Sequence, residues 1–485
     1  MSGTGPGTPR RRAVGGRVET RRTVDGRGRR TTRRSRRADP VLLVPLLVLG
    51  LVVAAALAPA GGEGEVAPRP VPVAQTSYAC SGAPDVLTGQ VEAGTAASAT
   101  RMPGAAAVAD AADPAAWVRS PGDDGGEPSS LLVTQDGVAA GAVGFVSGVL
   151  DDEGDGLVVG RCPGVVDDAW FAGLGSGEGH LGSLLLTNLA DTPAVVDVSL
   201  WSADGPLEAV GGDGLVVDPG AVRVVQLADL AAGEPTLGVH LSRRRGAVSV
   251  AALDTLTGTP AGSELVAAAE APARRQVLAG LPAGDRGRSL TVLNPGSEAA
   301  RVRVEALGPD GPFVPEGLDE VRVGAGSVAS MAVPRSAGSG AVALRLVSDV
   351  PVVASASAAP EEDDVAVVGA APVWEGPAVA PLDGDVGTPD LVLTAPGGAA
   401  RRVVVEAVDA DRRVVGRAEV EVAAGTTVGL DPADELDLGG ATVLVVRSTG
   451  GVVGSAQYRD GDRRAALVLT PAPTRVPAPQ VRPAP

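Results

Sequence analysis

Two histidines, His180 and His240, supply all the imidazole side chains of this 485-residue chain. A Ser–His–Asp hydrolase would have to use one of them as its general base, and Ser176 and Ser183 lie close to His180 in the sequence. Neither serine lies in the Gly-x-Ser-x-Gly turn that presents a nucleophile, and neither histidine has a companion at metal-ligand spacing. We therefore expect solvated or half-buried histidines, and we assign no catalytic residue and no metal ligand.

Three glycines around the first histidine, Gly177, Gly179 and Gly182, satisfy the Gly-x-Gly-x-x-Gly pattern of dinucleotide-binding proteins. In those proteins a strand precedes the pattern and a helix follows it. Here the segment that follows, residues 184–188 (LLLTN), has the composition of a β-strand. The glycines are therefore expected to form a flexible connection between two strands, and no cofactor is predicted.

Acidic turns offer oxygen ligands at several points of the chain. Residues 151–156 (DDEGDG) resemble half of a calcium-binding loop, but Cys162 stands where the loop needs its final glutamate. Residues 361–364 and 383–385 are acidic as well. Calcium at a domain junction is one interpretation and solvated acidic loops are the other. We favour solvated loops and predict no metal site.

The elements that carry these residues begin with a strongly basic segment. Residues 1–40 contain 13 Arg and three acidic residues, so they carry +10 and the remaining chain carries −27, for a net charge of −17. The segment has no apolar periodicity and is expected to be a disordered tail. An excess of arginine before an apolar segment holds that end of the chain in the cytoplasm.

Residues 41–60 contain no charge and are long enough to cross a bilayer. Twenty helical residues extend about 30 Å, the thickness of the hydrocarbon core. An uncleaved signal anchor fits this segment, whereas Ala56, Ala58 and Ala60 would suit cleavage of a signal peptide. We favour the anchor, because a 40-residue basic region is long for a cleaved signal. The predicted localisation is a single-pass membrane protein with a cytoplasmic N-terminus and the rest of the chain outside.

Cys80 and Cys162 both follow the predicted span. Two cysteines in an oxidising compartment are most simply explained as one disulfide. A free pair and a redox-active pair are the alternatives, although redox pairs usually have the Cys-x-x-Cys spacing. We predict the Cys80–Cys162 disulfide.

The chain after the span repeats at intervals of about 100 residues. Residues 170–174 (WFAGL) resemble residues 277–281 (VLAGL), and an alternating Val-rich run follows each, at 194–201 and 300–307. Alternation of period two, with turns every 8–12 residues, predicts antiparallel strands with one packed face. The two asparagines of the chain, Asn188 and Asn294, occupy equivalent repeat positions, where we expect Asx turns that close a strand.

We therefore predict an all-β fold of tandem immunoglobulin-like β-sandwiches, after one N-terminal transmembrane helix. Three sandwiches are clear in the sequence, and a diverged unit precedes them. One buried aromatic residue is expected in each core, from Trp117, Trp170, Trp201 and Trp374. The predicted boundaries are a tail at 1–40, the span at 41–60, a linker at 61–75, the diverged β unit at 76–160, sandwiches at 161–260, 261–360 and 361–470, and a Pro-rich polyproline II tail at 471–485.

One segment carries a resemblance to known proteins: residues 161–163 (RCP), 168–174 (DAWFAGL) and 184–188 (LLLTN). With the Arg-rich start and the single apolar span, it resembles a family of actinobacterial membrane-anchored or secreted proteins of unknown function. The resemblance implies a cell-envelope setting, beside glycosyltransferase or wall-assembly machinery. It brings no catalytic residue to this chain.

Composition narrows the function further. Three Phe, two Tyr and four Trp leave few rings for stacking on sugars or bases, and the −27 charge opposes binding of nucleic acid outside the membrane. We predict a non-catalytic scaffold or interaction protein of the cell envelope, whose partners are the membrane, through residues 41–60, and envelope proteins. The first alternative is an accessory or regulatory subunit of an envelope glycosyltransferase or transporter. The second, with least support, is a wall-modifying hydrolase, because 58 acidic residues offer many carboxylate pairs and nothing selects one.

Overall fold

The computed structural model describes residues 70–72, 75–83, 85–90, 97–101, 118–120, 131–136, 141–150, 156–257, 261–269, 271–281, 287–338, 340, 342–359, 364–382, 386–472 and 475–477. The predicted tail at 1–40 and the predicted span at 41–60 lie outside the described residues. Within the described ranges, no helix is both long and apolar enough to cross a membrane. Contacts divide the chain into Met1–Ala67 and Pro68–Pro485, and the β units named below all lie within Pro68–Pro485.

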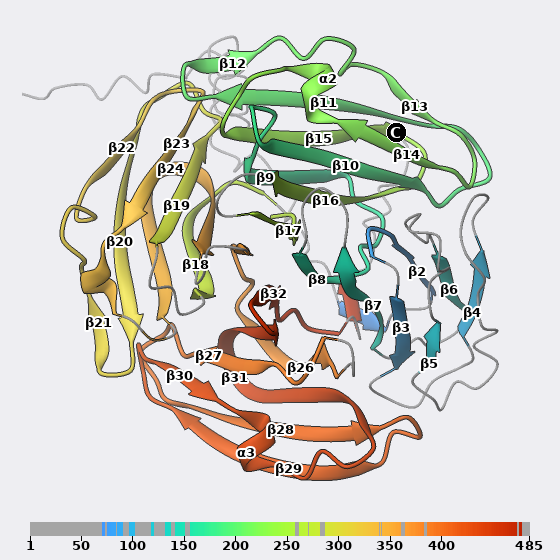
Figure 1. The fold of residues 1–485 in the computed structure, drawn as a ribbon, viewed down its shortest axis with the longest axis vertical. Helices are drawn as coiled ribbons and strands as arrows, with labels where there is room; N and C mark the ends of the chain where they lie inside the picture. Colours follow the sequence, from blue (N-terminus) through green and yellow to red (C-terminus); the bar gives the residue numbers. More distant parts are fainter. Residues whose placement is uncertain are drawn as a thin grey trace, which may run out of the picture. The chain divides into compact units, whose positions relative to one another are not determined.

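The described chain is all-β, with antiparallel strands throughout, as predicted (Figure 1). The strand β11 (Ala194–Ser202) shows why. Its Ala194, Val196, Val198 and Leu200 are buried, while the residues between them are more exposed. Successive side chains of a strand point to opposite faces, so this alternation packs one face and leaves the other wet.

The unit formed by β9 to β17 contains two sheets that share one hydrophobic core (Figure 1, green). One sheet has the order β12-β11-β15-β9, with β13 beside β11, and the other has the order β14-β10-β16-β17. The bounds are β9 (Asp168–Leu174), β10 (His180–Asn188), β12 (Gly205–Leu207), β13 (Leu215–Val217), β14 (Val222–Gln226), α2 (Leu227–Leu230), β15 (Leu237–Arg245), β16 (Val248–Thr257) and β17 (Ala261–Val266). We call this the second unit.

The third unit repeats the arrangement, except that one long strand serves both sheets. The first part of β24 (Val342–Ala359) pairs with β18 and β20, and its second part pairs with β19 and β25. The other bounds are β18 (Ala273–Leu281), β19 (Gly287–Asn294), β20 (Ala300–Gly308), β21 (Gly311–Phe313), β22 (Val321–Val323), β23 (Ser327–Val333), η1 (Arg335–Ala337) and β25 (Ala366–Gly369).

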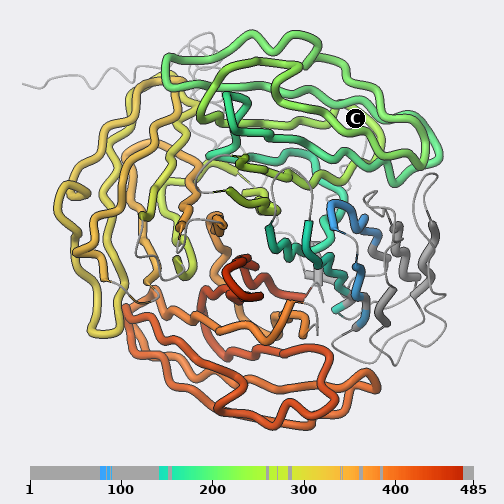
Figure 2. The backbone as a smooth tube through the Cα atoms, viewed as in Figure 1, coloured from blue at the N-terminus to red at the C-terminus, as the bar shows by residue number. Residues whose placement is uncertain are grey.

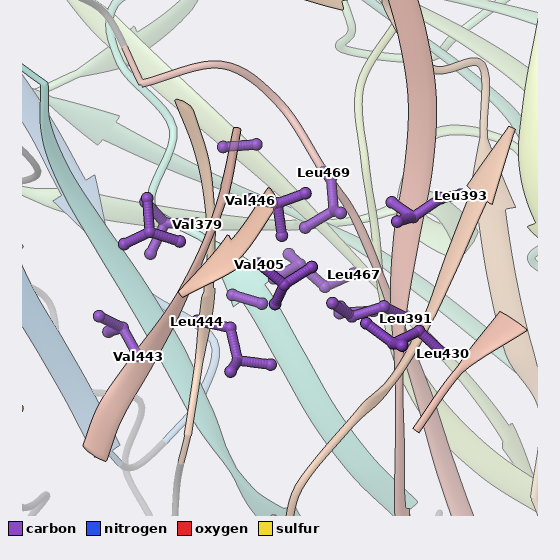
Figure 3. Packing of buried hydrophobic residues seen from close by; sticks show 14 of the residues in the cluster. Val379, Leu391, Leu393, Val405, Leu430, Val443, Leu444, Val446, Leu467 and Leu469 are labelled. Carbon is purple, nitrogen blue, oxygen red and sulfur yellow. The ribbon is translucent and has the colours of Figure 1, made fainter. Parts of the chain in front are cut away.

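In the fourth unit the long strand β31 (Ala441–Asp460) likewise serves both sheets, since its first part pairs with β26 and β28 and its second part pairs with β27. The hairpins of this unit can be followed in Figure 2 (orange to red). Its core contains Val405, Leu444, Val446, Leu467 and Leu469 (Figure 3). The other bounds are β26 (Trp374–Pro381), β27 (Asp390–Thr394), β28 (Arg401–Asp409), β29 (Val414–Val422), β30 (Thr427–Leu430), α3 (Pro432–Glu435) and β32 (Arg463–Val468).

The first, diverged unit has a sheet of order β2-β6-β4 and a sheet of order β5-β3-β7-β8. Its bounds are β2 (Gln75–Cys80), β3 (Asp85–Gln90), β4 (Ala97–Arg101), β5 (Val118–Ser120), β6 (Leu131–Asp136), β7 (Ala142–Leu150) and β8 (Gly156–Arg161). A short strand before it, β1 (Pro70–Pro72), pairs with β33 (Arg475–Pro477). Part of the segment that we expected to be a polyproline II tail therefore pairs with part of the predicted linker at 61–75.

Unit boundaries fall later than the sequence analysis placed them. The second and third sandwiches were expected to begin at residues 261 and 361, but β17 pairs with β16 and β25 pairs with β24. Each of these strands is the second half of a hairpin, so it completes the sheet of the preceding unit. The third unit accordingly begins at β18 and the fourth at β26.

The last strand of each unit contacts the last strands of other units. β8 contacts β17, β17 contacts β25, β25 contacts β32, and β32 contacts β8. We call these four the inner strands. Apolar side chains of different units meet around them, since Leu157 of β8 shares a core with the fourth unit and Leu265 of β17 packs against the first. The inner strands therefore join the four units.

Candidate functional site

His180 begins β10 and directs both ring nitrogens at acceptors. Its Nε2 lies 2.6 Å from Oδ2 of Asp254, and its Nδ1 lies 3.1 Å from the carbonyl oxygen of Pro235. Burial lowers the pKa of His180, but the hydrogen bond and charge of Asp254 and the Pro235 carbonyl raise it, and the net direction is upward. Both nitrogens of this half-buried ring therefore already face a partner, and the protonated ring could donate to both acceptors.

The serines beside His180 have other partners. Ser176 donates to the carbonyl of Ala231 and accepts from the backbone N–H of Glu234, and Ser183 donates to the carbonyl of Leu253. In the described part of the chain neither serine bonds His180, so the residues of a Ser–His–Asp triad are not brought together.

Gly177 and Gly179 connect β9 to β10, which confirms the predicted connection between strands, whereas Gly182 lies within β10. Close packing accounts for some of the glycines in this region. A Cβ atom on Gly175 would lie 1.9 Å from Nδ1 of His180, and one on Gly182 would lie 2.5 Å from the Gly175 carbonyl oxygen. The loop therefore encloses the imidazole, and no helix N-terminus follows it.

His240 lies in an aromatic stack. Its ring stacks on Trp170 with centroids 3.8 Å apart, Trp170 stacks on Trp201 at 5.7 Å, and Asp168 Oδ1 lies 2.8 Å from His240 Nε2. Trp170 and Trp201 are partly buried against Leu293, Val328 and Val353 of the third unit. We expected each tryptophan in the core of a single unit, but Trp170 and Trp201 lie at a contact between units. Trp374 does lie in a core, and Trp117 lies outside the described residues.

Asn188 and Asn294 form the predicted Asx turns. The side-chain oxygen of Asn188 accepts from the N–H of Ala190, and that of Asn294 accepts from Gly296. Both side chains are fully buried. Their amide groups donate to carbonyls in matching places, Thr192, Val217 and Asp218 for the first and Glu298, Val323 and Gly324 for the second. Both asparagines are structural.

Cys80 and Cys162 are bonded in the structure, with Cα atoms 4.5 Å apart. The bond packs on Gly144, where a Cβ atom would lie 2.9 Å and 3.1 Å from the two sulfur atoms. Beside it, burial raises the pKa of Tyr78 and lowers the pKa of Arg161 to about 10. The Arg161 guanidinium donates to Thr470 Oγ1 and to the Pro471 carbonyl, so it links the first unit to the end of the fourth.

Two acidic residues at the inner strands were not found by the sequence analysis. Asp364, two residues before β25, is fully buried, although the acidic turn at 361–364 was expected to be solvated. Its carboxylate accepts the backbone N–H groups of Val365, at 2.7 Å, of Arg464 in β32 and of Leu157 in β8. Asp364 therefore connects three units, and a Cβ atom on Gly262 of the remaining unit would lie 2.4 Å from its Oδ1.

Asp364 has no counterpart in the other units. In the register of the last hairpins, Gly262 and Arg463 occupy the position of Asp364, because each lies four residues before the paired residue Val266, Leu467 or Val368 of its strand. The absence of a side chain at Gly262 leaves room for the Asp364 carboxylate. Burial raises the pKa of Asp364 to about 7, although its backbone donors and the charge of Arg464 oppose this shift.

Glu264 of β17 is the second buried acid. Its Oε1 accepts from the N–H of Ala466 in β32 at 3.4 Å, and its buried Oε2 has no partner. Burial and the charge of Asp364 raise the pKa of Glu264 well above its usual range, which favours its protonated form. The signal that points to both residues is an acid at a position where the equivalent strands of other units carry glycine, alanine or arginine.

The described part of the chain holds no group of three or more His, Cys, Asp or Glu side chains that could bind a metal ion. The candidate calcium ligands at 151–155, 361–363 and 383–385 lie outside the described residues.

Comparison with known proteins gives a family and one structural likeness. A family model described as "Family of unknown function (DUF5719)" matches residues 119–433. No curated protein matches the chain. One similar solved structure is "Crystal Structure of Thermotoga maritima 1070", from Thermotoga maritima, at 22% identity and a TM-score of 0.17, covering 20% of this chain and 93% of that one.

Proposed function

Because the chain belongs to DUF5719, a family of unknown function, we propose its function from its own residues. We propose a non-catalytic scaffold or interaction protein of the cell envelope, held in the membrane by residues 41–60 with the β units outside.

The hydrogen-bond partners of the candidate catalytic side chains give this proposal its strongest support. The two ring nitrogens of His180 face a carboxylate and a carbonyl oxygen, and Ser176 donates to a backbone carbonyl. A general base needs a free lone pair, and a nucleophile needs a base within hydrogen-bond reach. These side chains hold loops in place, and such a structural role agrees with a non-catalytic scaffold.

We propose that each of the four β units, which end in the inner strands β8, β17, β25 and β32, is an immunoglobulin-like sandwich. Two antiparallel sheets around one core, joined by a strand that serves both sheets, support this assignment. A Cys80–Cys162 disulfide suits an oxidising compartment, which agrees with a location outside the cytoplasm.

The surface charge indicates the kind of partner. The residues after the basic tail carry −27, which repels other anionic polymers and favours basic or cation-bridged partners. We propose that loops and outer sheet faces of the units carry the binding surface, since the inner strands are occupied by contacts between units.

Crosslinking of the full-length chain in its native membranes, followed by purification, tests this proposal. A scaffold should capture several envelope proteins in amounts that fall with added salt. One glycosyltransferase or transporter captured at fixed stoichiometry would instead support the accessory-subunit alternative.

A direct assay tests the absence of catalysis. The purified chain and its His180→Gln variant should release no sugar or peptide from cell-wall polymer. Hydrolysis by the wild-type chain that the His180→Gln variant lacks would overturn the non-catalytic proposal.

A further inference from the structure

The inner strands bring two carboxyl groups into a site without a compensating base. In the described part of the chain neither Glu264 nor Asp364 forms an ion pair with an arginine. Arg464, whose backbone N–H donates to Asp364, uses its guanidinium on the carbonyls of Gly461 and Arg463. The pair is therefore held by backbone groups.

The charged groups of the surrounding strands are engaged elsewhere. On β16, the buried Asp254 lies opposite Glu264 in the register; its Oδ2 faces His180, and its Oδ1 has no hydrogen-bond partner. On β32, Arg463 lies 3.4 Å from Asp460. β8 faces Asp364 with the backbone of Leu157 and has no titratable group at this point.

One proton stabilises this arrangement. Two buried carboxylates that lie near each other cannot both ionise without a large electrostatic cost. Three backbone N–H groups donate to Asp364 and stabilise its ionised form. Oε2 of Glu264 receives no donor, so of the two acids Glu264 is the one better suited to hold the proton.

We propose that Glu264 and Asp364 form a proton-binding pair, and that loss of its proton at alkaline pH loosens the contact of β17 with β25 and β32. This regulatory role goes beyond the proposed scaffold function and does not depend on it. Its physical basis is that Oε2 would become a buried, unpaired charge, which only separation of the strands could hydrate.

The direction of the pH effect follows from which state binds more protons. In the unfolded chain both acids titrate near pH 4, whereas in the folded chain the pKa of Asp364 is about 7 and that of Glu264 is raised well above its usual range. The contribution is fully present below about pH 4 and is lost as the pH rises. For each acid, the unfolding equilibrium constant rises up to about tenfold per pH unit while the folded state alone holds the proton.

Urea unfolding of the full-length chain at pH 5 and pH 8 tests the proposal. The Glu264→Gln variant keeps the size of the side chain and removes its titration. We expect its urea midpoint to exceed that of the wild type at pH 8 and to differ little at pH 5. The matched control is Glu316→Gln, at an exposed loop residue, which should keep the wild-type dependence on pH. A Glu264→Gln variant with the wild-type dependence would overturn the proposal.

Hydrogen exchange of the wild-type chain gives a second readout that needs no variant. After correction for the intrinsic effect of pH, amides of β25 and β32 should exchange faster at pH 8 than at pH 5, while those of the distant β11 should not. Equal corrected exchange at the two pH values would also overturn the proposal, even if the Glu264→Gln variant fails to fold.

Discussion

The Asx turns and the inner-strand site use buried polar side chains in opposite ways. Asn188 and Asn294 occur at equivalent positions and bond equivalent partners, each within its own unit. Asp364 replaces residues that are glycine or arginine in the other units, and two of its three backbone partners, Arg464 and Leu157, lie in other units. Polar residues that recur thus build a unit, and those that occur once join units.

The fourth unit shows that the repeated turn can be replaced. Ala395 stands where the other units have asparagine, and its own N–H donates to the carbonyl of Thr426. Thr426 in turn donates from its side chain to the carbonyl of Ala423. Backbone and hydroxyl bonds at this position close the strand without an Asx turn.

The largest expected effect concerns the disulfide, which occurs once and lies within the first unit. Replacement of Cys80 and Cys162 by serine should lower the free energy of unfolding by about 4–5 kcal/mol, because the bond closes a loop of 82 residues. Denaturant unfolding measures this loss, with the reduced wild-type chain as the control. Mass spectrometry without reductant should find the two cysteines joined, and alkylation of both in natively isolated protein would contradict the disulfide.

The repeated turns come next. Asn188→Ala and Asn294→Ala should each cost about 2–4 kcal/mol, because several buried carbonyls lose their donor. Asn188→Asp should be at least as damaging, since it would place a charge against the same carbonyls. Thr192→Ala is the matched control, because Thr192 contributes only its backbone to the turn. An equal loss in all variants, measured by urea unfolding, would break the comparison.

A glycine at a contact between units should have a somewhat smaller effect. Gly280 has a φ of 71°, and a Cβ atom there would lie 2.6 Å from Ser455 Oγ and 2.7 Å from Val392 of the fourth unit. Gly280→Ala should cost about 2–3 kcal/mol through backbone strain and overpacking. Gly211→Ala, with a φ of 75° and open space around it, isolates the backbone term at about 1 kcal/mol. Equal Tm values for the two variants would refute close packing at Gly280.

The smallest expected effect concerns the His180–Asp254 pair. The pKa of His180 is raised in the folded chain, so its contribution is present below about pH 6.5 and is lost as the pH rises through the folded value. His180→Gln should cost about 1 kcal/mol at pH 5 and less at pH 8. Urea midpoints of the variant and the wild type, compared at both pH values, measure this difference. A greater loss at pH 8 would show that the pair is not a charged one.

Local patterns predicted much of the fold correctly. The alternation in residues 194–201 predicted a half-buried strand. The position of Asn188 after residues 184–187 (LLLT) predicted a turn that closes the preceding strand, β10. The connection formed by Gly177 and Gly179 followed from the strand pattern after it. Each of these depends on neighbours within a few residues, which the sequence contains.

Contacts between distant segments were not predictable in this way. Trp170 and Trp201 were expected in a core, but they pack against the next unit, and the hairpin strand at 261–266 was placed in the wrong unit. Glu264 lies in that same strand. An acid in a short strand is equally compatible with a solvent-facing position until the neighbouring strands are known.

The sequence by itself determined that this chain forms strands with one apolar face, because side chains alternate across every extended segment. Only the tertiary structure decided which acids are buried. Asp364 loses its solvent because β8, β17 and β32 converge on it, and it keeps its place because Gly262 has no side chain to fill that space. Burial of a charged group is a property of all the strands around it, and no local pattern contains it.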